Sequence, residues 1–275
     1  MARKPAFISH SREREAQIQS RMLDVLERRF RRQIAAAIVA EGNRIRLGYV
    51  ALGYVPSVSD QHSQDLREIY RQLALTAART FGRRIVTQGK AAGLILETKE
   101  ISFLELFQSF ALAWVQQEAI RRRITSVSET TRAQIVSFVA QGQRDGLGVD
   151  AIAQMIEDRL PDIGRWRGAL IARTETHGAA NFATHEVAKT TGMQLEKEWV
   201  AVEDARTRRI GMDDEYDHAA MDGQRVAMDE PFMMPWVGGP DLPIMYPGEA
   251  GKPAASVIQC RCAVVHHPVG GFDLD

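Results

Sequence analysis

The chain has 275 residues, of which 45% are hydrophobic and 25% charged, and its 35 basic and 35 acidic residues give a formal net charge of zero. These proportions are typical of a globular protein and exclude a disordered or fibrous chain. The zero net charge excludes a partner selected by overall electrostatic attraction. A chain of this length can bury a core without a disulfide or a metal ion.

The charge is nevertheless unevenly distributed. Basic residues outnumber acidic ones in residues 1–47, whereas residues 204–249 are acidic. Clustered arginines can contact DNA phosphates without reading the base sequence, and we expect this weak contact from Arg28, Arg29, Arg31 and Arg32. The alternative is that these arginines form a solvated helix face.

The first two thirds of the sequence predict helices. Apolar residues recur at helical spacing in residues 15–47 and 63–89, and residues 102–124 form a third, more hydrophobic segment. Ser128 followed by Glu129 is typical of a helix N-cap and predicts that the next helix begins there.

Residues 150–192 predict two further helices. A short helix over 150–160 is followed by Pro161, Asp162, Ile163 and Gly164, which are typical of a turn, and then by a long helix ending near Gly192. Such a pair, residues 150–180, resembles a helix-turn-helix that would present Arg165 and Arg167 to DNA. A sequence-specific DNA-binding protein is therefore the alternative function, although hairpins of this shape are also common packing units, with Trp166 and Leu170 in a core.

After Gly192 seven prolines exclude long helices, and short strands are predicted in "LEKEWVAV", "QRVAM", "PIMYP" and "SVIQCRCAVVHH". The expected fold class is α+β, with mostly helical N-terminal two thirds followed by a small C-terminal module with short antiparallel strands. We expect a helical region over 1–127 with a basic N-terminus, and a second region over 128–275. In the second region helices extend to residue 192 and the β-containing part covers 193–275.

The only two cysteines, Cys260 and Cys262, are one residue apart. On a strand they would face the same side, too far apart for a relaxed disulfide. They could bind zinc with His218, His266 or His267, which would permit a third function as a zinc-dependent enzyme. The favoured prediction is that both are reduced, buried residues of the closing strand, with Arg261 pointing outward.

Signatures of common enzyme families are absent from the sequence, and no catalytic residue is predicted. Neither a membrane span nor a signal peptide is predicted, so we expect a reducing cytoplasm as the place of synthesis.

Five blocks follow one another in the second half: "IARTETHGAANFA", "KEWVAVEDARTR", "HAAMDG", "MYPGE" and "VIQCRC". This succession, over about residues 130–268, resembles the phage Mu F-like minor head proteins, the phage head morphogenesis family. The resemblance implies motif residues with structural or interaction roles at Arg173, Thr174, Glu175, Asn181, Trp199, Asp204, Arg206, Arg208, His218, Asp222, Gly223, Cys260, Arg261 and Cys262. It also implies ion pairs between Arg173 or Arg206 and Asp204 or Asp222.

The same resemblance implies a function. It predicts a minor capsid protein of a tailed bacteriophage, present in the virion and assembled in the cytoplasm of the bacterial host. The implied partners are the portal protein, capsid or scaffolding proteins and DNA bound nonspecifically, with roles in packaging or ejection and none at a membrane.

Overall fold

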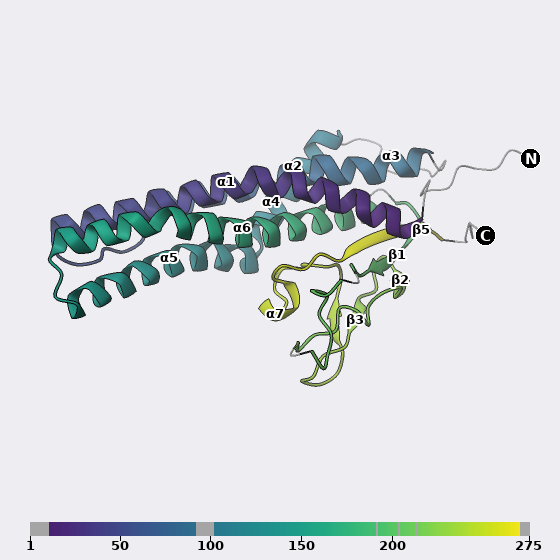
Figure 1. The fold of residues 1–275 in the computed structure, drawn as a ribbon. Helices are drawn as coiled ribbons and strands as arrows, with labels where there is room; N and C mark the ends of the chain where they lie inside the picture. The colour runs from purple at the N-terminus through teal and green to yellow at the C-terminus, as the bar shows by residue number, and fades with distance from the viewer. Residues whose placement is uncertain (1–10, 92–101, 191, 203, 213, 270–275) are drawn as a thin grey trace, which may run out of the picture. The chain divides into compact units, whose positions relative to one another are not determined.

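The computed structural model describes residues 11–91, 102–190, 192–202, 204–212 and 214–269. Its helical part consists of α1 (Arg12–Leu52), α2 (Asp60–Ala77), the π-helical segment η1 (Ala78–Gly82), α3 (Arg83–Ala91), α4 (Phe103–Gln116), α5 (Glu118–Arg144) and α6 (Val149–Thr190) (Figure 1). The remainder comprises β1 (Leu195–Val200), β2 (Arg225–Ala227), β3 (Phe232–Met234), β4 (Leu242–Ile244), α7 (Ala254–Val257) and β5 (Ala263–Pro268). This order confirms the predicted fold class. Within the described ranges, every helix lacks either the length or the apolar character needed to span a membrane.

The chain divides into two compact units. Unit 1 comprises Met1–Leu26, Leu73–Trp114 and Thr174–Asp275, and unit 2 comprises Glu27–Gln72 and Val115–Arg173. Each unit is therefore assembled from separate pieces of the chain. The division of the sequence between residues 127 and 128 stays a prediction.

Unit 2 has a core made by apolar residues repeated along its helices. α1 contributes Ile45 and Tyr49, α5 contributes Ile135 and Val139, and α6 contributes Ile152, Ile156 and Leu160. Residues four apart lie on the same face of a helix, so each helix turns one apolar stripe inward.

The predicted turn at residues 161–164 is wrong, because α6 continues through Pro161 as one helix. Gly164, which favoured a turn, instead permits close packing inside unit 2. A methyl group at Gly164 would lie 2.6 Å from Cγ2 of Val39 and 3.0 Å from the carbonyl oxygen of Ala35. The absence of a side chain thus lets α6 approach α1 closely within unit 2.

The predicted helix start at Ser128 is also wrong. α5 begins at Glu118, after Gln117 adopts a non-helical ψ of 133°, and Ser128 lies buried within the helix. The hydroxyl of Ser128 donates to the carbonyl oxygen of Ile124 at 3.4 Å, and that of Thr131 donates to Val127 at 2.9 Å. These bonds to the preceding turn satisfy hydroxyls that would otherwise be unpaired in the interior.

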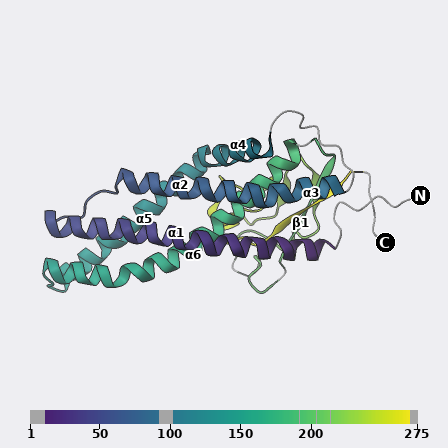
Figure 2. The same cartoon turned by 90° about the horizontal axis from the view of Figure 1, so that it is seen from above.

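Unit 1 contains both small sheets. β1 is the central strand of a three-stranded antiparallel sheet in the order β2-β1-β5, and β3 pairs with β4. Leu195 and Val200 of β1 pack with Val265 of β5 against Phe107 of α4 and Val187 of α6. Figure 2 shows β1 and these helices from above. The second half of α6 is thereby fixed beside the sheet.

The two cysteines lie outside the strand predicted for them. α7 ends at Val257, the chain turns through Gln259 at a φ of 56°, and β5 begins at Ala263. Cys260, Arg261 and Cys262 therefore form a short loop that leads into the strand. Residues 254–257 form a helical turn instead of the first part of the predicted strand, with Pro253 as its N-cap residue.

Candidate functional site

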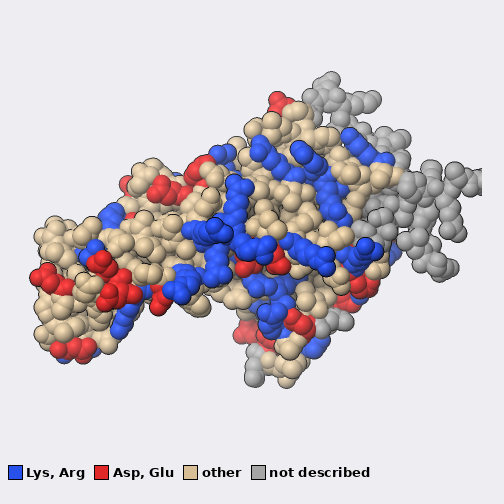
Figure 3. Space-filling model, turned by 45° about the horizontal axis from the view of Figure 1, so that its top comes forward, with Lys and Arg blue, Asp and Glu red and all other residues tan. Residues whose placement is uncertain are grey.

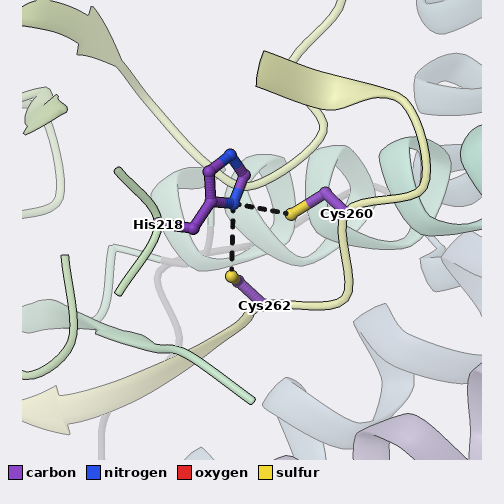
Figure 4. Close-up of side chains that lie close together, drawn as sticks. All are labelled: His218, Cys260 and Cys262. Atoms are coloured by element: carbon purple, nitrogen blue, oxygen red, sulfur yellow. Dashed lines mark hydrogen bonds between the residues drawn. The ribbon is translucent and has the colours of Figure 1, made fainter. Parts of the chain in front are cut away.

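His218, Cys260 and Cys262 form a buried cluster in unit 1. Nδ1 of His218 lies 3.5 Å from Sγ of Cys260 and 3.5 Å from Sγ of Cys262 (Figure 4). The three side chains are buried, both thiols are free, and the three potential ligand atoms all lie within 4.8 Å of one another. The cluster joins two segments that are more than 40 residues apart in the sequence.

His218 is positioned by a backbone hydrogen bond and by contact with the ring of one tryptophan. The carbonyl oxygen of Arg208 accepts the backbone N–H of His218 at 3.0 Å. The ring of Trp199, on β1, meets the imidazole edge to face at 6.0 Å between centroids and an interplanar angle of 76°. Gly223, at a φ of 75°, donates its N–H to the carbonyl oxygen of Trp199 at 2.9 Å and so fixes the turn after His218.

The cysteine loop is held by the second half of α6. Oγ1 of Thr174 accepts the N–H of Gln259 at 3.2 Å, and the ring Nε2 of His177 lies 2.7 Å from the carbonyl oxygen of Cys262. Nδ2 of Asn181 donates to the backbone carbonyl of His177 at 3.1 Å. Side chains three and four residues apart on α6 therefore position the loop that presents both thiols.

Arg261, between the two cysteines, turns its side chain the other way. Its guanidinium donates one hydrogen bond of 2.6 Å to each carboxylate oxygen of Asp204. Arg206 adds its backbone N–H at 2.9 Å and a guanidinium contact at 3.2 Å, so the predicted pairing of Arg206 with Asp204 is observed. These contacts, led by Arg261, hold the pKa of Asp204 well below its usual range. Arg261 is thus engaged in an ion pair and only partly exposed.

Asp222 pairs with a residue from the start of α1. Its Oδ1 accepts the N–H of Ala201 at 2.9 Å, and its Oδ2 accepts from Arg12 at 2.5 Å. Arg12 also donates to Oε1 of Glu198 at 2.7 Å. Asp222 and then Glu198 raise the pKa of Arg12 above its ordinary value. Contact with Arg12 was not predicted, since no motif marks that arginine.

His177 is the second residue that the sequence reasoning missed as a site residue. It lies inside the first family block, three residues after Thr174 and four before Asn181. That spacing places all three side chains on one face of a helix, and it is the feature of the sequence from which His177 could have been predicted.

The two thiols differ in their acidity. Burial acts to raise the pKa of Cys260, but the contact with Cys262 and the nearby His177 and His218 outweigh it, and the pKa is lowered well below the ordinary thiol value. Cys260 and burial raise the pKa of Cys262. Ionisation of one thiol therefore opposes ionisation of the other, because a second negative charge would lie beside the first.

The remaining family residues lie close to these contacts or on the same elements. Arg208 donates a guanidinium hydrogen bond to the carbonyl oxygen of Ile258, before the cysteine loop. Glu175 is buried on α6 and Arg173 is partly buried on the same helix. Thus the loop, the His218 turn and the Asp204 turn are linked by side chains from the family blocks.

The arginines proposed to meet DNA separate into two groups. The four on α1 (Arg28, Arg29, Arg31 and Arg32) are exposed. In unit 2, Arg165 is exposed and paired with Asp162, whereas Arg167 is only 5% exposed and donates to Thr131 and to the carbonyl oxygen of Val127.

The predicted DNA-reading hairpin therefore loses its structural basis. Arg167 is engaged in the interior, and α6 has no turn at residues 161–164. Trp166 is 64% exposed, so the alternative prediction that it belongs to a core is also wrong.

The fold and the cluster define a class: a mainly helical protein whose small β module is packed around a buried Cys–His group. Residues 133–265, a little under half of the chain, match the family described as Phage Mu protein F like protein. This part of the chain is phage Mu F-like, and the family implies a phage head morphogenesis protein. No curated protein and no solved structure matched in the corresponding comparisons.

Proposed function

We propose that this chain is a structural subunit of the phage head that lies at the portal vertex, contacts packaged DNA through α1 and catalyses no reaction. In this role it acts during head assembly and during packaging or ejection, after synthesis in the cytoplasm of the bacterial host. Its proposed partners are the portal protein, capsid or scaffolding proteins, and DNA without sequence preference.

The observation that carries the DNA contact is the exposed arginine run on α1. Arg28, Arg29, Arg31 and Arg32 lie within five consecutive residues, and all four are exposed. Figure 3 shows lysine and arginine side chains gathered on the face of the molecule that it displays. Arginine on a helix surface can neutralise phosphates and release their counterions.

The structural role is supported by what the family residues contact. Asp204, Asp222, Thr174 and His177 are engaged with arginines, backbone groups or the cysteine loop of the same unit. Such contacts are what a rigid interaction module requires. The portal as partner is supported by the Mu F-like family alone.

A salt titration of DNA binding tests the arginine contact. The test variant replaces Arg28, Arg29, Arg31 and Arg32 with glutamine. The matched control replaces four exposed arginines elsewhere with glutamine (Arg67, Arg71, Arg121 and Arg122). We expect the test variant to bind more weakly at low salt and to lower the slope of log K against log salt by up to about four, with no sequence preference. An unchanged slope in the test variant, or equal losses in both variants, would contradict the contact.

Cross-linking of assembled heads followed by mass spectrometry tests the portal association. We expect cross-links between this chain and the portal protein in purified heads. Cross-links confined to the major capsid protein or to tail proteins would contradict the proposed location.

A further inference from the structure

We propose that His218, Cys260 and Cys262 bind one zinc ion, through Nδ1 and the two Sγ atoms, which ties the cysteine loop to the His218 turn. The ion would act as a structural cross-link, with a water molecule as its fourth ligand. Zinc binding goes beyond the proposed role in the head, and either proposal can fail while the other stands.

The distances from Nδ1 to the two Sγ atoms fit tetrahedral zinc. With Zn–S bonds of about 2.3 Å and Zn–N bonds of about 2.0 to 2.1 Å, a tetrahedral ion places a sulfur and a nitrogen about 3.6 Å apart. Both observed separations between Nδ1 and Sγ are 3.5 Å. The imidazole nitrogen thus already lies at the distance from each sulfur that the ion requires.

Nδ1 of His218 faces two sulfur atoms at once. A neutral imidazole has one acceptor nitrogen with a single in-plane lone pair, so Nδ1 of His218 can accept one of the two thiols well. Cys260 and Cys262 nevertheless lie at the same distance from it. A cation between the three atoms accepts electron density from each of them at once.

The charge balance also favours a divalent ion. Two thiolates and a neutral imidazole around Zn²⁺ carry no net charge, so the loaded site can be buried without an unpaired charge. All three side chains are less than 5% exposed. Thiolate and imidazole donors are also those that select zinc over magnesium or calcium.

A small cavity beside the cluster supplies the fourth position. The cavity of about 20 Å³ is lined by His218, Cys260, Cys262 and neighbouring residues that include Thr207 and Arg208. It has room for about one water molecule. Because the ion would join the cysteine loop to the His218 turn, the role that we assign to it is cross-linking.

Metal analysis of the whole purified protein tests the proposal. Protein prepared without chelators is expected to contain about one zinc per chain by elemental mass spectrometry. Replacement of zinc by Co²⁺ is expected to give the intense d–d absorption of a tetrahedral ion and a thiolate-to-cobalt charge-transfer band. Zinc well below stoichiometry that zinc addition does not restore, a different stoichiometric metal, or an octahedral cobalt spectrum would overturn the proposal.

Variants assign the ligands. Cys260→Ser, Cys262→Ser and His218→Gln are each expected to lose the bound metal, whereas His267→Gln, a histidine outside the cluster, is expected to keep it. Retention of stoichiometric zinc by the three cluster variants would overturn the assignment. If these variants do not fold, the cobalt spectrum of the unaltered chain still decides the proposal.

Discussion

Arg261 and Asp204 are joined by two parallel hydrogen bonds of 2.6 Å, and the arginine lies between the two cysteines of the buried cluster. The loop is therefore fixed on both sides, by the thiols turned inward and by the guanidinium turned toward the Asp204 turn. Bidentate pairing of this kind gives geometric specificity as well as stability.

The first prediction concerns this pair. Because the pKa of Asp204 is lower in the folded protein than in the unfolded chain, its stabilising effect is present above a pH of about 4 and is lost as the pH falls below that value. Asp204→Asn should therefore lower the melting temperature at neutral pH and have a progressively smaller effect below pH 4. Melting curves of both proteins across this range test the prediction, and a penalty that is constant with pH would contradict it.

The second prediction concerns the glycines of α6. Gly164→Ala places a methyl group against Val39 and the backbone of Ala35 in unit 2, so it should destabilise the protein by about 1 to 3 kcal/mol. Gly148→Ala is the matched control, since a methyl group there meets nothing within 4 Å. Urea unfolding of the two variants gives the comparison. Equal stability of the variants would argue against close packing at Gly164.

The third prediction concerns His266 and His185, two buried histidines of unit 1. Burial, followed by nearby positive charges, lowers the pKa of each to about 3. A histidine in the unfolded chain has a pKa of about 6.5, so below this pH the unfolded chain binds more protons than the folded protein. These two histidines should therefore not lower the free energy of unfolding above that pH. Between that pH and pH 3 the free energy of unfolding should fall by up to about 1.4 kcal/mol per pH unit for each histidine.

His266→Phe removes one of these titrations while keeping an aromatic ring. The variant should show a shallower loss of unfolding free energy between pH 7 and pH 5 than the unaltered protein, as measured by urea unfolding at several pH values. Parallel curves for the two proteins would show that His266 does not contribute.

The fourth prediction concerns Lys197, which is buried on β1. Its Nζ donates to the carbonyl oxygen of Met245 at 2.9 Å and lies 5.1 Å from the ring centroid of Phe232, and burial lowers its pKa to about 8. An unfolded lysine binds more protons between pH 8 and about 10.5, so stability should rise over that interval. Lys197→Met should abolish the rise. A rise of the same size in the variant would exclude Lys197 as its source.

Local patterns predicted the helices and most strands because their causes are local. The apolar repeat of residues 15–47, for example, describes one helix facing one core. Gly192, with a φ of 67°, follows α6 as the predicted end required.

The errors arose where a distant contact decided the local structure. Gly164 is typical of a turn in sequence, but in the structure it packs against α1. Ser128 is typical of an N-cap in sequence, but its hydroxyl donates to the carbonyl oxygen of Ile124. Arg12 donates hydrogen bonds to Glu198 and Asp222, which lie about 200 residues away in the sequence. Patterns of residue spacing within a helix or strand cannot predict a contact over that separation.

The five sequence blocks of the family predicted where the site lies, but they did not establish its third potential ligand. They brought together Thr174, Trp199, Asp204 and His218 around the cysteines, as the contacts in unit 1 show. Sequence alone favoured His218 as the third ligand and left His266 and His267 as alternatives. The structure distinguishes His218, since only the fold shows which ring nitrogen lies beside both sulfurs.

Quantitative mass spectrometry of purified, DNA-filled heads tests whether this chain is a structural subunit of the head. We expect peptides from this chain in those particles, in constant ratio to the portal protein after washing at high salt. If this chain is absent from the particles but abundant in the lysate from which they came, that result would contradict a role as a structural subunit of the head.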